Sequence, residues 1–268
     1  MKAFFSRHRF PLFFYCISKG VGLSVLYRFV FYIIVFSDSF LSLLVIVYEE
    51  SDSLSVKNVF APIASRLIRC LLVNPKREWS VLELSKDADV SYGHAHKVVE
   101  TLMKLGFCRR TERNKVGLVN PAELLNRWAS YFEYSLANKV NSYYVEERDV
   151  EKFVNRLSEV ARGKTLKYAL TLHAGASLVA PFVRPMDVHI YVVPLDVEIW
   201  VRSLGLELIE FGGNIHLVEP YDLGVFYGCQ VRNGVSVVSN IQLYVDLYNY
   251  PARGREAAEH LRREVIGF

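Results

Sequence analysis

The sequence is poor in cysteine, and the cysteines that it has are scattered. The four are Cys16, Cys70, Cys108 and Cys229, and no two stand in a Cys-x-x-Cys spacing. Zinc sites and disulfide frameworks need cysteines at short, regular spacings. We therefore expect neither, and we expect no metal and no other cofactor. Irregularly spaced thiols are compatible with a reducing cytoplasm, which is the localisation that we expect.

A hydrophobic run long enough for a membrane-spanning helix is also lacking. Such a helix needs about 20 mostly apolar residues, whereas the run at 21–36 has sixteen and includes Arg28. A second apolar run, 40–48, is shorter still. No small-residue cleavage pattern typical of a secretory signal is present.

Residues 1–50 are nevertheless more hydrophobic than the rest of the chain, and three interpretations stay open. Residues 10–48 form a marginal membrane anchor, in which case Lys2, Arg7 and Arg9 favour a cytoplasmic amino end. Alternatively, the reading frame extends upstream of the true start. The third interpretation is a hairpin that packs in the core or against a partner.

A large excess of one charge sign is absent as well. The net charge of +4 by itself says little about partners, but its distribution is informative. Residues 57–128 hold thirteen Lys and Arg against seven acids, whereas residues 129–268 hold fourteen against seventeen. Positive charge is therefore concentrated in the middle of the chain, as a phosphate-contacting module requires. With 51% hydrophobic residues, the chain can also form a packed core.

This basic segment begins with the pattern of two helices. Residues 60–73 repeat apolar side chains at helical spacing, which predicts a helix with one buried stripe. Pro75 ends it, because proline disfavours helical geometry in the residue before it. Ser80 and Glu83 then form a capping-box pattern, which predicts a second helix over 81–88.

A third helix is predicted over 92–105, with Ser91 as its cap and Gly106 at its end. The short turn between the second and third helices is typical of a helix-turn-helix, whose later helix enters the major groove of DNA. A solvated helix face with no partner fits the same pattern. The candidate DNA contacts on this helix are Ser91, Tyr92, Gly93, His94, His96, Lys97 and Thr101.

A basic hairpin is predicted directly after this helix, with strands at 107–110 and 116–119. A hairpin in this place is typical of a wing, which lies along the sugar-phosphate backbone. The combination predicts a winged helix-turn-helix DNA-binding domain over 57–135; winged helices that bind other proteins are the alternative. The candidate phosphate contacts are Arg109, Arg110, Arg113 and Lys115.

The remainder, residues 145–268, alternates between predicted strands and predicted helices. The predicted strands are 167–171, 187–193, 206–211 and 215–219, and the predicted helices are 147–161, 173–182, 197–204, 240–248 and 252–266. An Asn-Gly pair at 233–234 indicates a hairpin turn, and the polar stretch 136–144 indicates a linker. The fold class is therefore α+β: a winged helix-turn-helix followed by a mixed α/β domain with a central sheet.

One segment of this second domain is similar to the core of nucleotidyltransferases. There a glycine turn precedes a strand with an Asp-x-Asp pair, whose carboxylates hold metal ions. In this sequence the turn is 173–176, and His189 stands in place of the second acid. Asp187 alone cannot hold two magnesium ions, so we expect at most a degenerate core and no catalytic residue. The histidines at 173, 189, 216 and 260 are too dispersed to predict a metal cluster.

The carboxyl-terminal end is dense in charge. A solvated helix with pairs such as Arg255 and Glu259 explains most of this pattern, and a partner surface is the sharper alternative. The candidate partner-binding residues are Asp246, Arg253, Arg255 and Glu256.

Several motifs together resemble a known family. They are Asn74-Pro75, Glu78-Trp79, Ser91, Asn120-Pro121 with Leu124-Leu125 and Trp128, and, more distinctively, the stretches 239–247 and 253–261. In these motifs the chain, from about residue 59 onward, resembles the AbiEi-type antitoxins of type IV toxin-antitoxin systems and their stand-alone relatives. Residues 1–50 lie outside the resemblance.

The resemblance implies a cytoplasmic transcriptional regulator with two domains. Its winged helix would bind double-stranded DNA in its own promoter, and its second domain would antagonise a toxin without catalysis. Because the toxins of that family resemble nucleotidyltransferases, the implied partner is such a toxin or its targets. A regulator without a toxin and a nucleotidyltransferase-like enzyme are the alternatives.

Overall fold

A computed structural model describes residues 29–37, 40–48, 56 and 58–268. The chain divides into two units, Met1–Leu54 and Ser55–Phe268. In the first unit, β1 (Phe29–Ser37) pairs antiparallel with β2 (Phe40–Tyr48). The two apolar runs are thus strands over these residues, and Lys2, Arg7, Arg9 and the first part of the expected anchor lie outside the described residues. Among the described helices, none is both long and apolar enough to cross a membrane.

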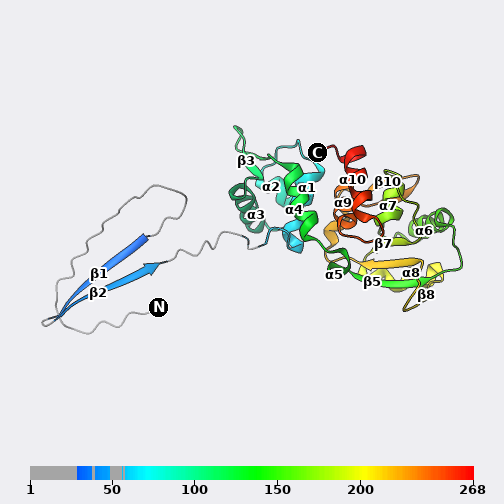
Figure 1. The fold of residues 1–268 in the computed structure, drawn as a ribbon, viewed down its shortest axis with the longest axis horizontal. Helices are drawn as coiled ribbons and strands as arrows, with labels where there is room; N and C mark the ends of the chain where they lie inside the picture. Colours follow the sequence, from blue (N-terminus) through cyan, green and yellow to red (C-terminus); the bar gives the residue numbers. More distant parts are fainter. Residues whose placement is uncertain (1–28, 38–39, 49–55, 57) are drawn as a thin grey trace. The chain divides into compact units, whose positions relative to one another are not determined.

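The second unit begins with helices and a hairpin (Figure 1). The order is α1 (Pro62–Val73), α2 (Val81–Asp87), α3 (Tyr92–Lys104), β3 (Cys108–Arg110), β4 (Val116–Leu118) and α4 (Pro121–Tyr131). β3 and β4 pair antiparallel, Cys108 with Leu118 and Arg110 with Val116. The helices and both strands predicted from the sequence are present, with ends that differ by a few residues.

Local side-chain contacts define these ends. The Ser80 hydroxyl accepts from the backbone N–H of Glu83, and the Glu83 carboxylate accepts from the backbone N–H of Ser80, so the predicted capping box is confirmed. The Ser91 hydroxyl caps α3 by accepting from the backbone N–H of His94. Beyond α3, Gly106 takes a φ of +79°, a left-handed conformation that glycine adopts without a Cβ penalty.

The rest of the unit is built on a mixed seven-stranded sheet. Its order is β10-β11-β6-β7-β9-β5-β8, with β11 parallel to β6, β7 parallel to β9 and the other neighbours antiparallel. The strands are β5 (Lys139–Tyr144), β6 (Tyr168–Thr171), β7 (Val188–Val192), β8 (Glu207–Leu208), β9 (Ile215–Glu219), β10 (Gln230–Arg232) and β11 (Val235–Val237). The predicted α+β class, with a mixed sheet, is confirmed.

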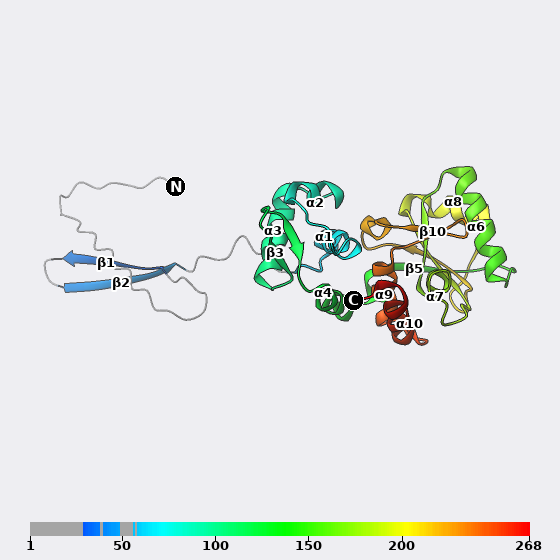
Figure 2. The ribbon, with the colours of Figure 1, turned by 90° about the horizontal axis from the view of Figure 1, so that it is seen from above.

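Helices accompany the sheet. They are α5 (Tyr134–Ala137), α6 (Val150–Lys164), α7 (Leu172–Ser177), α8 (Val197–Leu204), α9 (Asn240–Tyr248) and α10 (Gly254–Leu261), followed by a π turn, η3 (Arg262–Ile266). Short 3-10 turns, η1 (Pro194–Asp196) and η2 (Leu223–Phe226), interrupt the chain between strands. In Figure 2, α9 and α10 lie between α4, the last of the first four helices, and the sheet.

One prediction was wrong: residues 136–144, expected as a linker, contain a strand. β5 lies inside the sheet, between β9 and β8. Its polar residues have cross-strand partners, since the Lys139 ammonium and the Asn141 amide bind the Glu219 carboxylate and Ser142 contacts His216. A strand stabilised by such polar pairs lacks the apolar alternation by which a strand is recognised.

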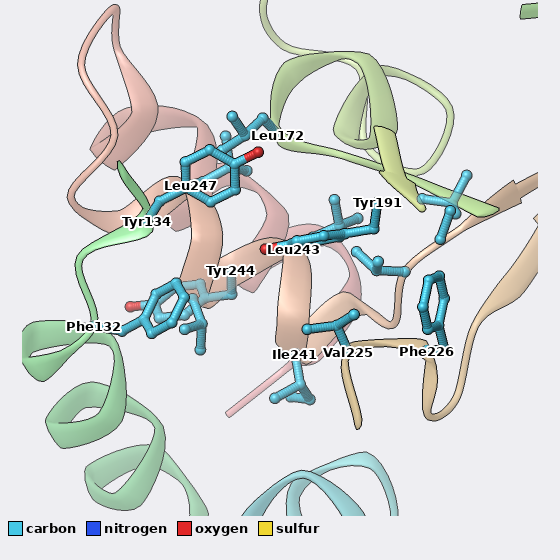
Figure 3. Close-up of a cluster of buried hydrophobic side chains, with 14 of the residues drawn as sticks. Phe132, Tyr134, Leu172, Tyr191, Val225, Phe226, Ile241, Leu243, Tyr244 and Leu247 are labelled. Atoms are coloured by element: carbon cyan, nitrogen blue, oxygen red, sulfur yellow. The ribbon is translucent and has the colours of Figure 1, made fainter. Parts of the chain in front are cut away.

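The core is organised around α9, which is buried from Ile241 to Tyr248. Figure 3 shows Ile241, Leu243, Tyr244 and Leu247 of this helix among apolar side chains from several other elements. These neighbours come from the end of α4, the starts of α5 and α7, β7 and η2, and they include Phe132, Tyr134, Leu172, Tyr191, Val225 and Phe226. α9 also contacts α1, α4, α7 and α10. The helix therefore joins the first helices to the sheet.

A polar network passes through this apolar core. Arg69 of α1 is fully buried and donates from Nε and Nη2 to the Gln242 side-chain oxygen of α9, at 3.0 and 2.8 Å. The Gln242 amide donates at 2.7 Å to Asp246. The Asp246 carboxylate also accepts from Thr171 on β6, at 2.5 Å, and from Tyr191 on β7, at 3.2 Å. These bonds satisfy groups that would be costly to bury alone, although Arg69 Nη1 is buried without a hydrogen-bond partner among the described residues.

A second polar contact joins the same two regions nearer the surface. The Arg66 guanidinium binds both carboxylate oxygens of Asp222, at 2.8 and 2.9 Å. It also donates to the backbone oxygen and the carboxylate of Asp89, in the turn before α3. The partly buried bidentate pair fixes α1 against the segment before η2, because two parallel bonds allow one orientation only.

We expect Asp246→Asn to change how stability depends on pH. Burial raises the pKa of Asp246 to about 7, against about 3.9 in an unfolded chain. Between these values the folded chain holds a proton that the unfolded chain has released. The free energy of unfolding therefore falls with rising pH, by about 1.4 kcal/mol per unit from this group. The asparagine variant should lack this contribution in urea unfolding measured from pH 5 to pH 8.

Asp149→Asn is the matched control, because Asp149 is an exposed cap of α6 and asparagine caps equally well. Its pH profile should parallel that of the parent chain. If the Asp246→Asn profile is parallel to the parent profile too, Asp246 does not hold a proton in the folded state.

Candidate functional site

α3 presents one face to the core and its amino end to solvent. Ala95, Val98, Val99 and Leu102 are fully buried, in contact with α1 and α2. Ser91, Tyr92, Gly93 and Lys97 are exposed, Tyr92 to 53%. An amphipathic helix with its amino end exposed offers polar groups and free backbone N–H groups to a ligand.

The two histidines of α3 are half-buried. The His96 ring lies 6.2 Å from the Tyr92 ring, and its Nε2 lies 4.0 Å from a Glu100 oxygen. The Nε2 atom of His94 is buried and has no hydrogen-bond partner in the described chain. The His96 side chain is 41% exposed.

One sequence expectation for α3, that Thr101 contacts DNA, needs correction. Thr101 is buried, with 9% of its surface exposed. Its hydroxyl donates to the backbone oxygen of Lys97 and accepts from the backbone N–H of Val56. The side chain thus fills an internal role, and Thr101 is not a ligand contact. Leu105, the C-cap residue of α3, is 48% exposed.

The hairpin β3–β4 is held against the helices by Trp79. The backbone of Trp79, just before α2, forms two hydrogen bonds with Val116 of β4, and its buried ring stacks on Arg77. The sequence identified Trp79 only as a motif residue, because a single bridge leaves no pattern in the chain. The contact ties the hairpin to the start of the second helix.

The hairpin brings its basic residues to the surface next to α3. Arg110 lies 3.2 Å from Glu100 of α3, and Lys115 lies 3.9 Å from Glu83 of α2. Arg109 and Arg113 are exposed and have no ion pair within the described residues. Together with Ser91, Tyr92, Gly93, His94, His96 and Lys97, these four basic residues define what we call the helix–hairpin surface.

The candidate partner-binding residues of the carboxyl-terminal end do not form one surface. Asp246 is only 1% exposed and binds inside the core, so its assignment to a partner surface is wrong. Arg253 pairs with Glu256 at 2.6 Å, and Arg255 stacks on the Tyr248 ring at 3.6 Å. The exposed charges on α10 are largely paired within the helix, as a solvated helix predicts.

The histidines are closer together than their spacing in the sequence suggests. His189 of β7 and His216 of β9 are register partners on neighbouring parallel strands, and their rings stack 4.2 Å apart. Asp187, two residues before His189, lies 3.7 Å from His189 Nε2 and 3.6 Å from His216 Nε2. His189 and His216, which the sequence spacing placed among histidines too dispersed for a metal cluster, therefore lie together, because parallel pairing brings distant strands together.

The same cluster bears on the nucleotidyltransferase alternative. The acid partners of Asp187 that a two-metal site requires are replaced by two imidazoles. Although burial alone would raise it, contacts with His189 and His216 hold the pKa of Asp187 well below its usual range. Burial lowers the pKa of His189. The cluster is thus one carboxylate flanked by two imidazoles, unlike the paired carboxylates of that enzyme core.

Comparison with known proteins adds a family to this geometry. A family model described as transcriptional regulator, AbiEi antitoxin, type IV TA system matches residues 117–267. A search of curated proteins and one of solved structures found no match. The match begins in β4 and runs through the sheet to η3, more than half of the chain. The chain therefore belongs to the AbiEi antitoxin family, the transcriptional regulators of type IV toxin-antitoxin systems.

Proposed function

We propose that α1 to α4 and the hairpin form a winged helix-turn-helix that binds double-stranded DNA in a sequence-specific way. α3 would enter the major groove, and the hairpin β3–β4 would lie on the phosphate backbone as the wing. The observation that carries the proposal is the helix–hairpin surface itself. It places the exposed amino end of a helix beside a basic hairpin, with the opposite helix face buried.

The contacts that hold this surface in place support the proposal. A helix that reads base edges must be held rigidly by the rest of the domain. α3 has four fully buried apolar residues on its inner face, and Trp79 attaches the hairpin through two backbone hydrogen bonds. Arg66 holds the turn before α3 through Asp89. Both parts of the surface are therefore fixed relative to one another.

The charge of the surface supports it as well. The amino end of α3 has free backbone N–H groups and the positive end of the helix dipole, which favour a phosphate. Lys97 follows one turn later, and Arg109 and Arg113 are exposed without an ion pair in the described chain. The pairs of Arg110 and Lys115 are exposed, and such pairs contribute only about 0–1 kcal/mol, so a phosphate can replace the acid.

We further propose that the chain represses its own promoter and acts as an antitoxin in the cytoplasm. This part rests on the family, whose description names a regulator and an antitoxin. In this proposal residues 57–135 bind DNA, and residues 145–268 antagonise a nucleotidyltransferase-like toxin or its targets. A regulator without a toxin differs only in the second role, which co-expression with the neighbouring gene tests by relief of growth inhibition.

The phosphate contacts are tested by the salt dependence of binding. Duplexes selected by the full chain from a library with randomised centres serve as probes. Lys97→Ala and Arg113→Ala should each weaken binding to all sequences alike. Each should also lower the slope of log affinity against log salt by about 0.9, because one fewer counterion is released. Fluorescence anisotropy over a salt series measures both quantities.

Lys164→Ala is the matched control, because Lys164 is an exposed residue at the end of α6, in the sheet region. Its salt slope should equal that of the parent chain. Equal slopes for all three variants would remove Lys97 and Arg113 from the interface.

Sequence readout is tested separately with Tyr92→Ala. Tyr92 is the largest exposed side chain at the amino end of α3. Loss of a base-edge contact should cost about 1–3 kcal/mol on the preferred duplex and little on unrelated duplexes. The ratio of the affinity for the preferred duplex to the affinity for unrelated duplexes should therefore fall. Phe211→Ala, at an aromatic residue that is 83% exposed in the sheet region, should leave the preference unchanged. A uniform loss on all duplexes for Tyr92→Ala would contradict a reading role.

Autoregulation is tested by footprinting the DNA upstream of the chain's own gene. Protection is expected with the parent chain and should be absent with the Lys97→Ala, Arg113→Ala double variant at the same concentration. A parent chain that binds the selected duplexes but leaves this DNA unprotected would contradict autoregulation without contradicting DNA binding.

A further inference from the structure

The geometry points to a site for one divalent transition-metal ion of the zinc class, held by Asp187, His189 and His216. The site lies at the start of β7 and β9, in the sheet, and shares no residue with the helix–hairpin surface. It is independent of the proposed DNA binding. Three side chains of the types that zinc prefers converge there, and the fourth position would be left to water.

The distances fit an ion of this kind. One ligand atom from each of the three residues lies within 4.8 Å of the other two. The Oδ2 atom of Asp187 lies 3.7 Å from His189 Nε2 and 3.6 Å from His216 Nε2. Both separations are too long for a direct hydrogen bond. Donors about 2.0–2.2 Å from a tetrahedral ion are roughly 3.3–3.6 Å apart. The two imidazole rings stack 4.2 Å apart with an angle of 21° between their planes, so the rings have to rotate for both Nε2 lone pairs to point at one ion.

Both imidazoles are oriented by their other ring nitrogen. His216 Nδ1 lies 3.0 Å from the Ser142 hydroxyl, and His189 Nδ1 lies 3.3 Å from the Tyr134 hydroxyl. With Nδ1 engaged, each ring presents Nε2 to the same carboxylate oxygen. Metal-binding histidines have this arrangement as a rule, because a bond at the second nitrogen fixes the tautomer and the ring plane.

The donor set, two imidazole nitrogens and one carboxylate oxygen, indicates the class of metal. Two imidazoles favour zinc or a similar ion over magnesium and calcium, which prefer oxygen.

One residue competes for the site. The Tyr250 hydroxyl lies 3.2 Å from His189 Nε2, the atom assigned to the metal. An entering ion would displace this hydroxyl from the nitrogen lone pair. The ring of Tyr250 also stands edge-on to His173, whose two ring nitrogens are buried and have no hydrogen-bond partner in the described chain.

An ion can reach the site from solvent on the side of the Asp187 carboxylate. The Asp187 side chain is 36% exposed, whereas those of His189 and His216 are 6% and 14% exposed. An ion can therefore enter from the Asp187 side and keep a water ligand there. Because the ligands come from two neighbouring strands and the residue before β7, the bound ion would fasten β7 to β9.

The test is zinc binding by the full chain, after treatment with a chelator, in competition with a chromophoric chelator. One equivalent of zinc should bind, and the melting temperature should rise with zinc concentration, because a ligand of the folded state stabilises it. His216→Ala should weaken binding at least about 100-fold. Ser142→Ala should weaken it about 10- to 100-fold, as loss of an orienting partner does. His260→Ala, at a half-buried histidine stacked on Phe182, should bind as the parent chain does.

Cobalt substitution distinguishes this site from binding by cysteine. Cobalt in a site of two imidazoles and one carboxylate should show d–d bands without a thiolate charge-transfer band. Because His216→Ala could disturb the sheet, Asp187→Asn provides the second variant: its side chain is one-third exposed, and its melting temperature without metal shows whether the fold persists. A folded Asp187→Asn chain that keeps the parent affinity, or a parent chain without a zinc equivalent, would overturn the assignment.

Discussion

The buried guanidinium of Arg69 is the constraint on which the arrangement of the second unit depends. An arginine cannot lose its charge in a protein interior, so every element around it has to provide an acceptor or an aromatic face. Gln242 accepts two of its hydrogen bonds, the Tyr221 hydroxyl accepts a third at 2.7 Å, and Trp128 lies 5.1 Å from it. One side chain of α1 thereby fixes the positions of α4, α9 and the segment before η2.

The buried Arg69 also joins the helices of Ser55–Phe268 to its sheet. A segment that begins as a bundle of helices and continues as a sheet could form two units joined by a linker, as the polar composition of 136–144 indicated. The linker is instead the strand β5, and α9 lies against both halves. Removal of one partner from a buried charged network is costly, so the helices and the sheet stabilise one another.

The helix–hairpin surface and the Asp187 cluster depend on the packing of this unit in different ways. The helix–hairpin surface is formed by residues close together in the sequence, and its geometry follows from local caps, the turn before α3 and the bridge at Trp79. The Asp187 cluster joins residues nearly thirty positions apart and exists only because β7 and β9 are parallel neighbours. The first is visible as a motif, and the second is a product of topology.

Much of the fold and part of the candidate site were therefore predictable from the sequence alone. The helices α1 to α3, the hairpin, the capping box at Ser80 and the family membership follow from local periodicity, caps and motifs, because those signals lie within a few residues of one another. The predicted bounds of α8, β9 and α9 also agree with the structure.

What only the tertiary structure decided concerns partners that are distant in the chain. Thr101 falls on the polar side of α3 in the sequence, yet the chain at Val56 covers it. Asp246 resembles a surface acid, yet it accepts hydrogen bonds from three elements in the core. Strand pairing brings His189 and His216 into contact. Burial and long-range pairing depend on how elements pack, and side-chain spacing along the chain contains no record of that packing.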